Sequence, residues 1–245
     1  MRLWRQLHIS TIILTQFDIS LFKLTVTLNP IIYGVLIVIL IWVSINVTNC
    51  SDGVDGLCGT LSAITLSSAY VLFMIFDIES SFRHTILIMV VCILGYLWFN
   101  ASPSKLLMGD AGSRAIGIFI AFAFLKLHSP LLYIPLAIVL IIDGGLGLIK
   151  VSFMRFLHIK IMQNIRTPIH DHMRKNKSWS DAQVVFRICN NTACYCGSYN
   201  ICSYIAASVD AAISFNRYPV IFKKAVILII YNSQKYPFLQ SIIYN

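Results

Sequence analysis

Residues 31–45 read IIYGVLIVILIWVSI, and residues 46–57 follow directly as NVTNCSDGVDGL. The first stretch is uncharged and lies inside a longer uncharged run, Leu24–Ser51. A membrane-spanning helix needs about 20 mostly apolar residues, because each residue rises about 1.5 Å across a hydrocarbon core of about 30 Å. The two stretches together therefore predict a transmembrane helix that ends in a strongly polar loop.

The composition of the whole chain also favours a membrane protein. Its 245 residues are 58% hydrophobic and only 12% charged, and its mean hydropathy is +0.77, whereas soluble domains carry about 25% charged residues. The net charge of +9 is typical of basic loops on the cytoplasmic side of a membrane and suits anionic lipids or a phosphorylated substrate. A nucleic-acid binder is disfavoured, because no basic soluble domain stands apart from the apolar segments.

The predicted fold class is all-α: a polytopic membrane helix bundle with about five transmembrane helices and cytoplasmic loops that form the site. Counting crossings places residues 46–55, 105–114 and 150–181 on one side, which the positive-inside rule makes cytoplasmic. The expected spans are Leu24–Ser51, Gly56–Phe76, Thr85–Ser104, Ala115–Leu127 and Leu131–Ile149, the last interrupted by Asp143.

The polar loop after the first span holds two carboxamides and two carboxylates: Asn46, Asn49, Asp52 and Asp55. Its glycines suggest a local break that brings the backbone close to a ligand. A carboxylate near the bilayer centre costs roughly 2.5–3.5 kcal/mol on insertion scales, so two of them at a helix end suggest a function. A polar helix cap with ordinary Asp-Gly turns explains the same residues equally well.

A second polar loop, residues 100–113, reads NASPSKLLMGDAGS. Asp110 lies between glycines, and such a carboxylate can ligate Mg²⁺ together with substrate phosphates. Lys105 is suited to face a phosphate as a point charge. Taken alone, the loop is better explained as a turn that opens the next helix with Asp110 as its N-cap.

A third polar segment, residues 166–174, reads RTPIHDHMR and lies in the basic stretch. His170 and His172 are candidates to bind a metal, bind phosphate or handle protons. The alternative is a solvated loop whose charges serve the positive-inside rule. All three segments fall on one predicted face, where a soluble, phosphate-bearing donor would meet a lipid-borne acceptor and Mg²⁺ would neutralise the phosphates.

These segments resemble the motifs of a known family. NVTNCSDGVDGL, FNASPSKLLMGDAGS (residues 99–113) and TPIHDHMRKNKSWSDAQVVFR (residues 167–187) are similar, in order and spacing, to three motifs of the phospho-N-acetylmuramoyl-pentapeptide transferases. That family belongs to the polyprenyl-phosphate sugar-phosphate transferases. The similarity runs from about Gln16 to Arg187.

The resemblance implies an enzyme that transfers phospho-MurNAc-pentapeptide from UDP-MurNAc-pentapeptide to undecaprenyl phosphate. This gives lipid I and UMP in peptidoglycan synthesis, and requires Mg²⁺ at the cytoplasmic face of the bacterial inner membrane. A homodimer is considered as its assembly. The resemblance assigns catalytic roles to Asp110, also the metal ligand, and to His170. It assigns substrate binding to Asn46, Asn49, Asp52, Asp55, Lys105 and His172.

The chain departs from the family in three places. Asp171 stands where the family has the middle of three histidines, no adjacent pair of aspartates precedes Asn46, and residues after Arg187 lose the family pattern. We therefore expect a partial transferase domain at 1–187, truncated at its N-terminus, a divergent segment at 188–245, and little turnover from this chain alone. The alternatives are a GlcNAc-1-phosphate polyprenyl transferase and a non-enzymatic membrane remnant. The PIHDH segment followed by WSD favours the pentapeptide enzyme over the first.

Overall fold

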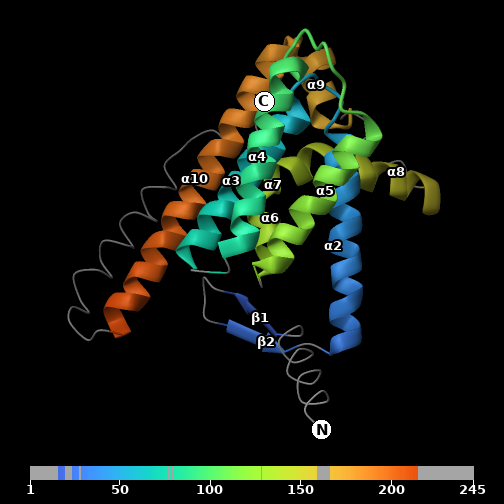
Figure 1. The fold of residues 1–245 in the computed structure, drawn as a ribbon. Coiled ribbons are helices and arrows are strands. Elements are labelled where there is room, and N and C mark those ends of the chain that lie inside the picture. Colours follow the sequence, from blue (N-terminus) through green and yellow to red (C-terminus); the bar gives the residue numbers. More distant parts are fainter. Residues whose placement is uncertain are drawn as a thin grey trace. The chain divides into compact units, whose positions relative to one another are not determined.

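The computed structural model describes residues 16–19, 24–27, 29–76, 78, 80–127, 129–158 and 166–214. The chain divides into two compact units, Met1–Asn200 and Ile201–Asn245, and all packing described below lies within the first. Helices dominate, as Figure 1 shows, so the predicted helical bundle is confirmed. Two short strands, β1 (Gln16–Ile19) and β2 (Leu24–Thr27), were not predicted; they pair antiparallel with Gln16 opposite Thr27.

The first span is the helix α2 (Pro30–Cys50), which begins six residues later than expected from Leu24. Asn29 is its N-cap and accepts a hydrogen bond from the Ile31 amide at 2.9 Å, while Pro30 occupies the first helical position. Both residues are typical of a helix start. The uncharged run in the sequence therefore starts before the helix does, because residues 24–27 are also uncharged but form a strand.

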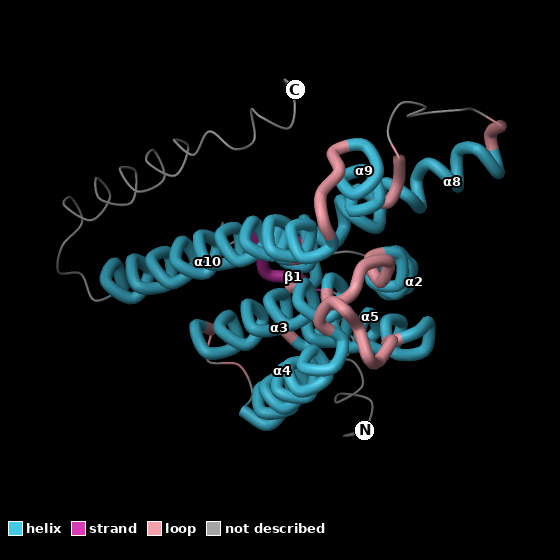
Figure 2. Tube along the Cα trace, turned by 90° about the horizontal axis from the view of Figure 1, so that it is seen from above, coloured by secondary structure: helices cyan, strands magenta, loops and turns pink. Residues whose placement is uncertain are grey.

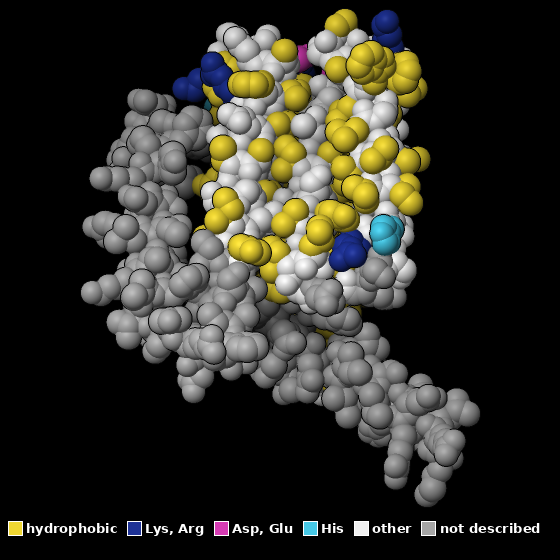
Figure 3. Space-filling model, turned by 60° about the vertical axis from the view of Figure 1, so that its left-hand side comes forward, with side chains coloured by type: hydrophobic (Ala, Val, Ile, Leu, Met, Phe, Trp, Pro, Cys, Tyr) yellow, Lys and Arg dark blue, Asp and Glu magenta, His cyan; other side chains and the backbone are white. Residues whose placement is uncertain are grey.

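Two further long helices follow, α3 (Leu57–Ile75) and α4 (Ser80–Asn100). α3 buries most of its apolar residues and forms the centre of the bundle, whereas α2 and α4 expose theirs. In Figure 3 apolar side chains cover the middle of the face that is shown, and basic side chains lie near its upper and lower edges. An exposed apolar middle between charged edges is the pattern expected of a surface that faces lipid.

The remaining helices of this region are α5 (Gly109–Lys126), η1 (Pro130–Leu132), α6 (Tyr133–Leu136), α7 (Ile138–Leu140), the π-helix η2 (Ile141–Gly145) and α8 (Leu146–Phe156). Among the described residues, α2, α3 and α4 are long and apolar enough to cross a membrane. A fourth span is counted if Pro130–Leu136 and Ile138–Phe156, which meet at 70°, form one broken crossing. α5, predicted from Ala115, begins earlier and has charged residues at both ends.

The last two described helices are α9 (Ile169–Asn176) and α10 (Asp181–Ser214). Arg174 of α9 pairs with Asp181 at 2.6 Å, and the guanidinium of Arg187 lies 4.2 Å above the centre of the Trp179 ring. α10 continues as one helix through Arg187, where the family pattern ends. The domain boundary expected at residue 187 therefore falls inside a helix and stays a prediction.

α2 is held at backbone distance by glycines on two neighbouring helices. A Cβ on Gly117 of α5 would lie 2.7 Å from the Ser44 carbonyl oxygen, and one on Gly144 of η2 would collide with the Val47 carbonyl oxygen. The Ser44 hydroxyl also donates to the Gly117 carbonyl at 2.7 Å. Small residues permit this close packing of membrane helices, and Figure 2 shows α2 and α5 side by side.

Candidate functional site

The polar segments meet at the end of the bundle where α2 finishes and α5 begins, beside α9 at the top of Figure 1. Five side chains, Asn49, Asp52, Asp55, Asp110 and Ser113, form what we call the carboxylate cluster. The Asn49 amide donates to Asp110 Oδ1 at 3.2 Å and to Ser113 Oγ at 3.0 Å. Because Asn49 is on the last turn of α2, these bonds join the first polar segment to the second.

The loops on either side of this junction are tied to each other as well. The Ser104 amide donates to Asp55 Oδ2 at 3.0 Å, and the Gly56 amide donates to Asn100 Oδ1 at 2.9 Å. The side-chain NH₂ group of Asn100 in turn donates to the backbone carbonyl of Leu106 at 2.8 Å. Gly56 has φ +81°, a left-handed conformation that side chains rarely adopt. Residues 51–56 and 101–108 thus form one connected platform.

The carboxylate cluster carries an excess of negative charge. Burial, and after it the nearby charges of Asp110 and Asp55, together raise the pKa of Asp52 to about 6. The Asp110 side chain is 77% exposed and pairs with Arg114 at 3.1 Å one turn along α5. A half-buried carboxylate that is crowded by two others is an arrangement that a cation would relieve.

His170 brings the third polar segment to the same place. It is buried, and both oxygens of Asp143 accept from it: Oδ1 from the backbone amide at 2.9 Å, and Oδ2 from ring Nδ1 at 2.8 Å. On its other side the imidazole lies against Gly53, where an added Cβ would collide with Nε2 and lie 3.0 Å from Cε1. The Asp143–His170 pair therefore docks α9 directly onto the loop that holds Asp52 and Asp55.

Some of the predicted site residues make other contacts. The side-chain amide of Asn46 donates to the backbone carbonyl of Trp42, one turn earlier in α2, at 2.7 Å. His172 Nδ1 accepts from the Arg166 amide at 3.4 Å, within its own segment, and Lys105 is exposed. The structure brings together five of the predicted residues, namely Asn49, Asp52, Asp55, Asp110 and His170.

Asp143 was missed as a site residue and noted only as an interruption of the fifth expected span. It is 2% exposed and lies in the π-helix η2, a rare distortion that is frequent at functional sites. The signal that could have found it was a carboxylate inside an apolar stretch, which by default marks a functional residue.

The residues present fit a magnesium ion. Within the described ranges no three His, Cys, Asp or Glu side chains are grouped as a ready-made metal site. Mg²⁺ does not need such a cage, because it commonly takes one or two carboxylates and completes its shell with substrate phosphates and water. The exposed Asp110 and the half-buried Asp52 supply carboxylates of that kind.

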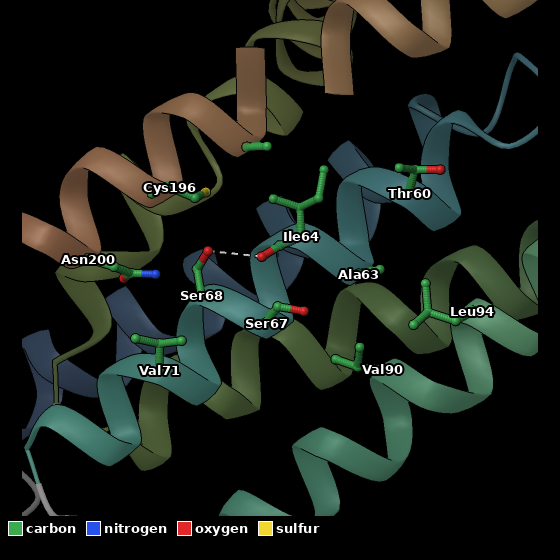
Figure 4. A pocket seen from close by; sticks show the side chains of 12 residues that line it. Thr60, Ala63, Ile64, Ser67, Ser68, Val71, Val90, Leu94, Cys196 and Asn200 are labelled. Atoms are coloured by element: carbon green, nitrogen blue, oxygen red, sulfur yellow. Dashed lines mark hydrogen bonds between the residues drawn. The ribbon is translucent and has the colours of Figure 1, made fainter. Parts of the chain in front are cut away.

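A hollow of about 360 Å³ lies elsewhere, between α3, α4 and α10 (Figure 4). None of its lining residues in the described part of the chain is charged. Its polar members include Thr60, Ser67 and Ser68, and the Ser68 hydroxyl donates to the Ile64 carbonyl of its own helix at 2.9 Å. Such a lining offers no charged side chain to a phosphate.

Comparison with known proteins adds a family. The model of glycosyl transferase family 4 matches residues 1–128. A phospho-N-acetylmuramoyl-pentapeptide-transferase of Treponema pallidum (strain Nichols) is 39% identical over an alignment of 178 residues that covers 66% of this chain and 49% of that protein. The proteins of the same name from Dictyoglomus thermophilum and Corynebacterium jeikeium are 32% identical over 164 residues and 29% over 192. They cover 65% and 69% of this chain. The chain spans about half the length of these curated relatives, 50% and 51% in the last two.

Proposed function

The chain belongs to glycosyl transferase family 4, and from this premise we propose that it acts at the lipid I step of peptidoglycan synthesis. The reaction is transfer of phospho-MurNAc-pentapeptide from UDP-MurNAc-pentapeptide to undecaprenyl phosphate, with release of UMP. The names of its relatives support the donor, since those proteins are phospho-N-acetylmuramoyl-pentapeptide-transferases. The apolar helices support a membrane protein, and the organisms of the relatives support a bacterial one.

The observation that carries the proposal is the meeting of the three polar segments at one end of the helical bundle. Asn49 contacts Asp110, Asp55 contacts the amide of Ser104, and His170 lies on Gly53. Residues that are more than a hundred positions apart in the sequence thus form one surface beside the ends of apolar helices. A soluble donor and a lipid acceptor can both reach such a place.

We assign the roles by chemistry. Asp110, helped by Asp52, would hold Mg²⁺, which when bound neutralises the phosphates of the donor and of the departing UMP. Asn49, Asp55 and Asn46 offer amide and carboxylate groups for the uridine. Lys105 and His172, the first of them exposed, would turn to the phosphates as donors. Phosphoryl transfer depends mainly on positioning and on charge stabilisation, and both are what these residues supply.

We also propose that the cluster faces the cytoplasm. Several basic residues belong to the two stretches that are predicted to lie on this side, 105–114 and 150–181. They include Lys105, Arg114, Lys150, Arg174 and Lys175. An excess of Lys and Arg in short loops marks the cytoplasmic side. A nucleotide-sugar donor is cytosolic, so the same orientation would bring the donor to the cluster.

The test uses the full chain in liposomes that contain undecaprenyl phosphate. Binding of UDP-MurNAc-pentapeptide is measured with and without Mg²⁺, and UMP release is followed over time. We expect Mg²⁺-dependent binding, and little turnover because no adjacent aspartate pair precedes Asn46. UDP-GlcNAc serves as the competing donor. Equal or tighter binding of UDP-GlcNAc would favour the alternative, a GlcNAc-1-phosphate polyprenyl transferase. Binding of neither nucleotide would refute the proposal.

A matched variant pair makes the binding result specific. Asp110→Asn removes the proposed metal ligand, whereas Asp171→Asn removes a carboxylate that pairs with Lys175 at 3.2 Å on α9. We expect only Asp110→Asn to abolish the effect of Mg²⁺. Equal effects of the two substitutions would show that general charge, and not the cluster, binds the nucleotide.

A further inference from the structure

The Asp143–His170 pair is built in a way that fixes which ring nitrogen of His170 is free. Oδ2 of Asp143 lies 2.8 Å from Nδ1, and a carboxylate is an acceptor only, so Nδ1 carries the proton. In the neutral ring Nε2 is then a bare acceptor. Nε2 is also the atom that faces Gly53, within the loop of Asp52 and Asp55.

The same carboxylate fixes the direction of the ring. Its other oxygen accepts the His170 backbone amide at 2.9 Å, an amide in the first turn of α9 that has no partner within its own helix. Pro168, the N-cap of α9, makes no side-chain cap. Asp143 therefore holds both the backbone and the ring of one residue, and the imidazole has no freedom to turn Nε2 away from the loop.

Burial strengthens this interpretation. The side chains of Asp143 and His170 are 2% and 4% exposed, and an unpaired carboxylate at such a depth is costly. A purely structural helix dock could use a neutral pair at lower cost. The free-energy cost of burying a carboxylate is explained if its charge is needed to fix the tautomer of the His170 imidazole, as in other carboxylate–histidine pairs.

We infer that Asp143 is a positioning residue: it sets the tautomer and orientation of His170 so that the bare Nε2 faces Gly53, in the loop that carries Asp52 and Asp55 of the proposed donor site. This role deepens the proposed function and rests on it for the identity of the ligand. The tautomer itself, however, is a property of the chain alone. It can be measured whether or not the nucleotide binds.

The decisive variant is Asp143→Asn, which keeps the size of the side chain. An asparagine can accept the His170 amide through its oxygen, but its NH₂ group then faces Nδ1 as a donor. The ring must release the Nδ1 proton and carry it on Nε2 instead. Turning the amide over restores the tautomer only by placing the NH₂ group against a buried backbone donor, which leaves that donor unsatisfied.

The experiment combines spectroscopy with binding. The full chain, labelled with ¹⁵N in its six histidines, is purified in detergent, and the ring nitrogen signals of His170 are assigned from a His170→Gln variant. We expect Nδ1 to be protonated in the wild type, Nε2 in Asp143→Asn, and the wild-type state in Asp143→Glu. Asp171→Asn should leave the signals unchanged. A wild-type ring protonated on Nε2, or a tautomer that Asp143→Asn does not change, would overturn the inference.

The binding arm separates this inference from the proposed function. If the wild type binds UDP-MurNAc-pentapeptide, we expect Asp143→Asn to weaken binding about tenfold, Asp143→Glu to recover part of the loss, and Asp171→Asn to bind normally. Unchanged affinity in Asp143→Asn would refute the positioning role. If the wild type binds no nucleotide, the proposed function fails, and the ring nitrogen signals alone decide whether Asp143 sets the tautomer. Thermal unfolding of each variant confirms that it is folded.

Discussion

Two groups of carboxylates lie at the same end of the bundle, and they differ in how their charge is met. Asp110 is 77% exposed and belongs to a cluster in which Asp52 and Asp55 add like charge. Asp143 is 2% exposed, and both of its oxygens are hydrogen-bonded to one residue. The carboxylate cluster therefore holds like charges that a cation would relieve, whereas both oxygens of Asp143 already have hydrogen-bond partners.

The difference shows that a carboxylate in a membrane protein cannot be interpreted from its presence alone. A partly exposed carboxylate that is crowded by like charges favours a binding site, and a buried carboxylate whose two oxygens are both hydrogen-bonded favours support for a neighbour. The two groups are joined through Gly53, on which the His170 ring lies. Substitutions on each side of this junction test whether the division is correct.

The largest effect is expected from Asp110→Asn in the carboxylate cluster. Loss of the proposed metal ligand should weaken Mg²⁺-dependent binding of UDP-MurNAc-pentapeptide by up to about a hundredfold, because the cation that neutralises the phosphates would be held less tightly. Titration calorimetry at several Mg²⁺ concentrations measures the loss. Binding that stays normal and remains Mg²⁺-dependent would mean that the metal is held elsewhere.

A somewhat smaller effect is expected from Gly53→Ala at the junction. The new Cβ would collide with the His170 ring, which cannot move aside because Asp143 holds it at 2.8 Å. We expect a loss of stability of about 1–3 kcal/mol from overpacking, measured by thermal unfolding in detergent, together with weaker nucleotide binding. Gly34→Ala is the matched control, since nothing lies within 4 Å of a Cβ there. If both variants behaved alike, the His170 ring would not be held against the loop.

Lys105→Gln tests the outer edge of the carboxylate cluster. This exposed lysine should contribute about 1 kcal/mol to the binding of donor phosphates, so its loss should weaken binding about fivefold, and less at high salt. Lys126→Gln, in the last turn of α5, removes the same charge at the other end of that helix and should have no effect. An equal loss in both variants would point to general attraction of the anionic nucleotide.

The smallest effect is a gain of stability in Asp52→Asn. The pKa of Asp52 is raised from 3.8 to about 6 by burial first and by Asp110 and Asp55 next, so its ionisation opposes folding. The variant should equal the wild type below pH 3.8 and become more stable as the pH rises to about 6. The gain should be only about 1 kcal/mol, because the group is half exposed and screened by solvent. Mg²⁺ should reduce the gain, and a loss of stability at pH 7 would contradict the charge crowding.

Much of the fold could be predicted because length and hydropathy are local properties of the sequence. The apolar runs identified both α3 and α4: Leu57–Ile75 lies inside the expected Gly56–Phe76, whereas Ser80–Asn100 begins five residues before the expected Thr85–Ser104. Boundaries were harder: Leu24–Thr27 is apolar but pairs as a strand, and α10 continues through a polar sequence beyond Arg187. In both cases the pattern of apolar residues does not distinguish the states that local sequence allows.

The convergence of the polar segments was predicted from crossing parity, and the contacts of Asn49 with Asp110 and of His170 with Gly53 agree with it. The partners of individual side chains were not predictable. Asn46 bonds to its own helix, and the position of Asp143 beside His170 depends on the π-helix and on the fold of α9. Such pairings arise from tertiary packing, which one sequence does not display.

The glycine contacts of α2 have a mechanical consequence for the whole unit. Gly117 and Gly144 contact the backbone of α2 at Ser44 and Val47. Main-chain atoms therefore fix the position of this helix along its axis relative to both neighbours. Its lipid-facing residues, such as Val38 and Trp42, take no part in that alignment. We therefore expect apolar substitutions at these two positions to leave the contact between Asn49 and Asp110 unchanged.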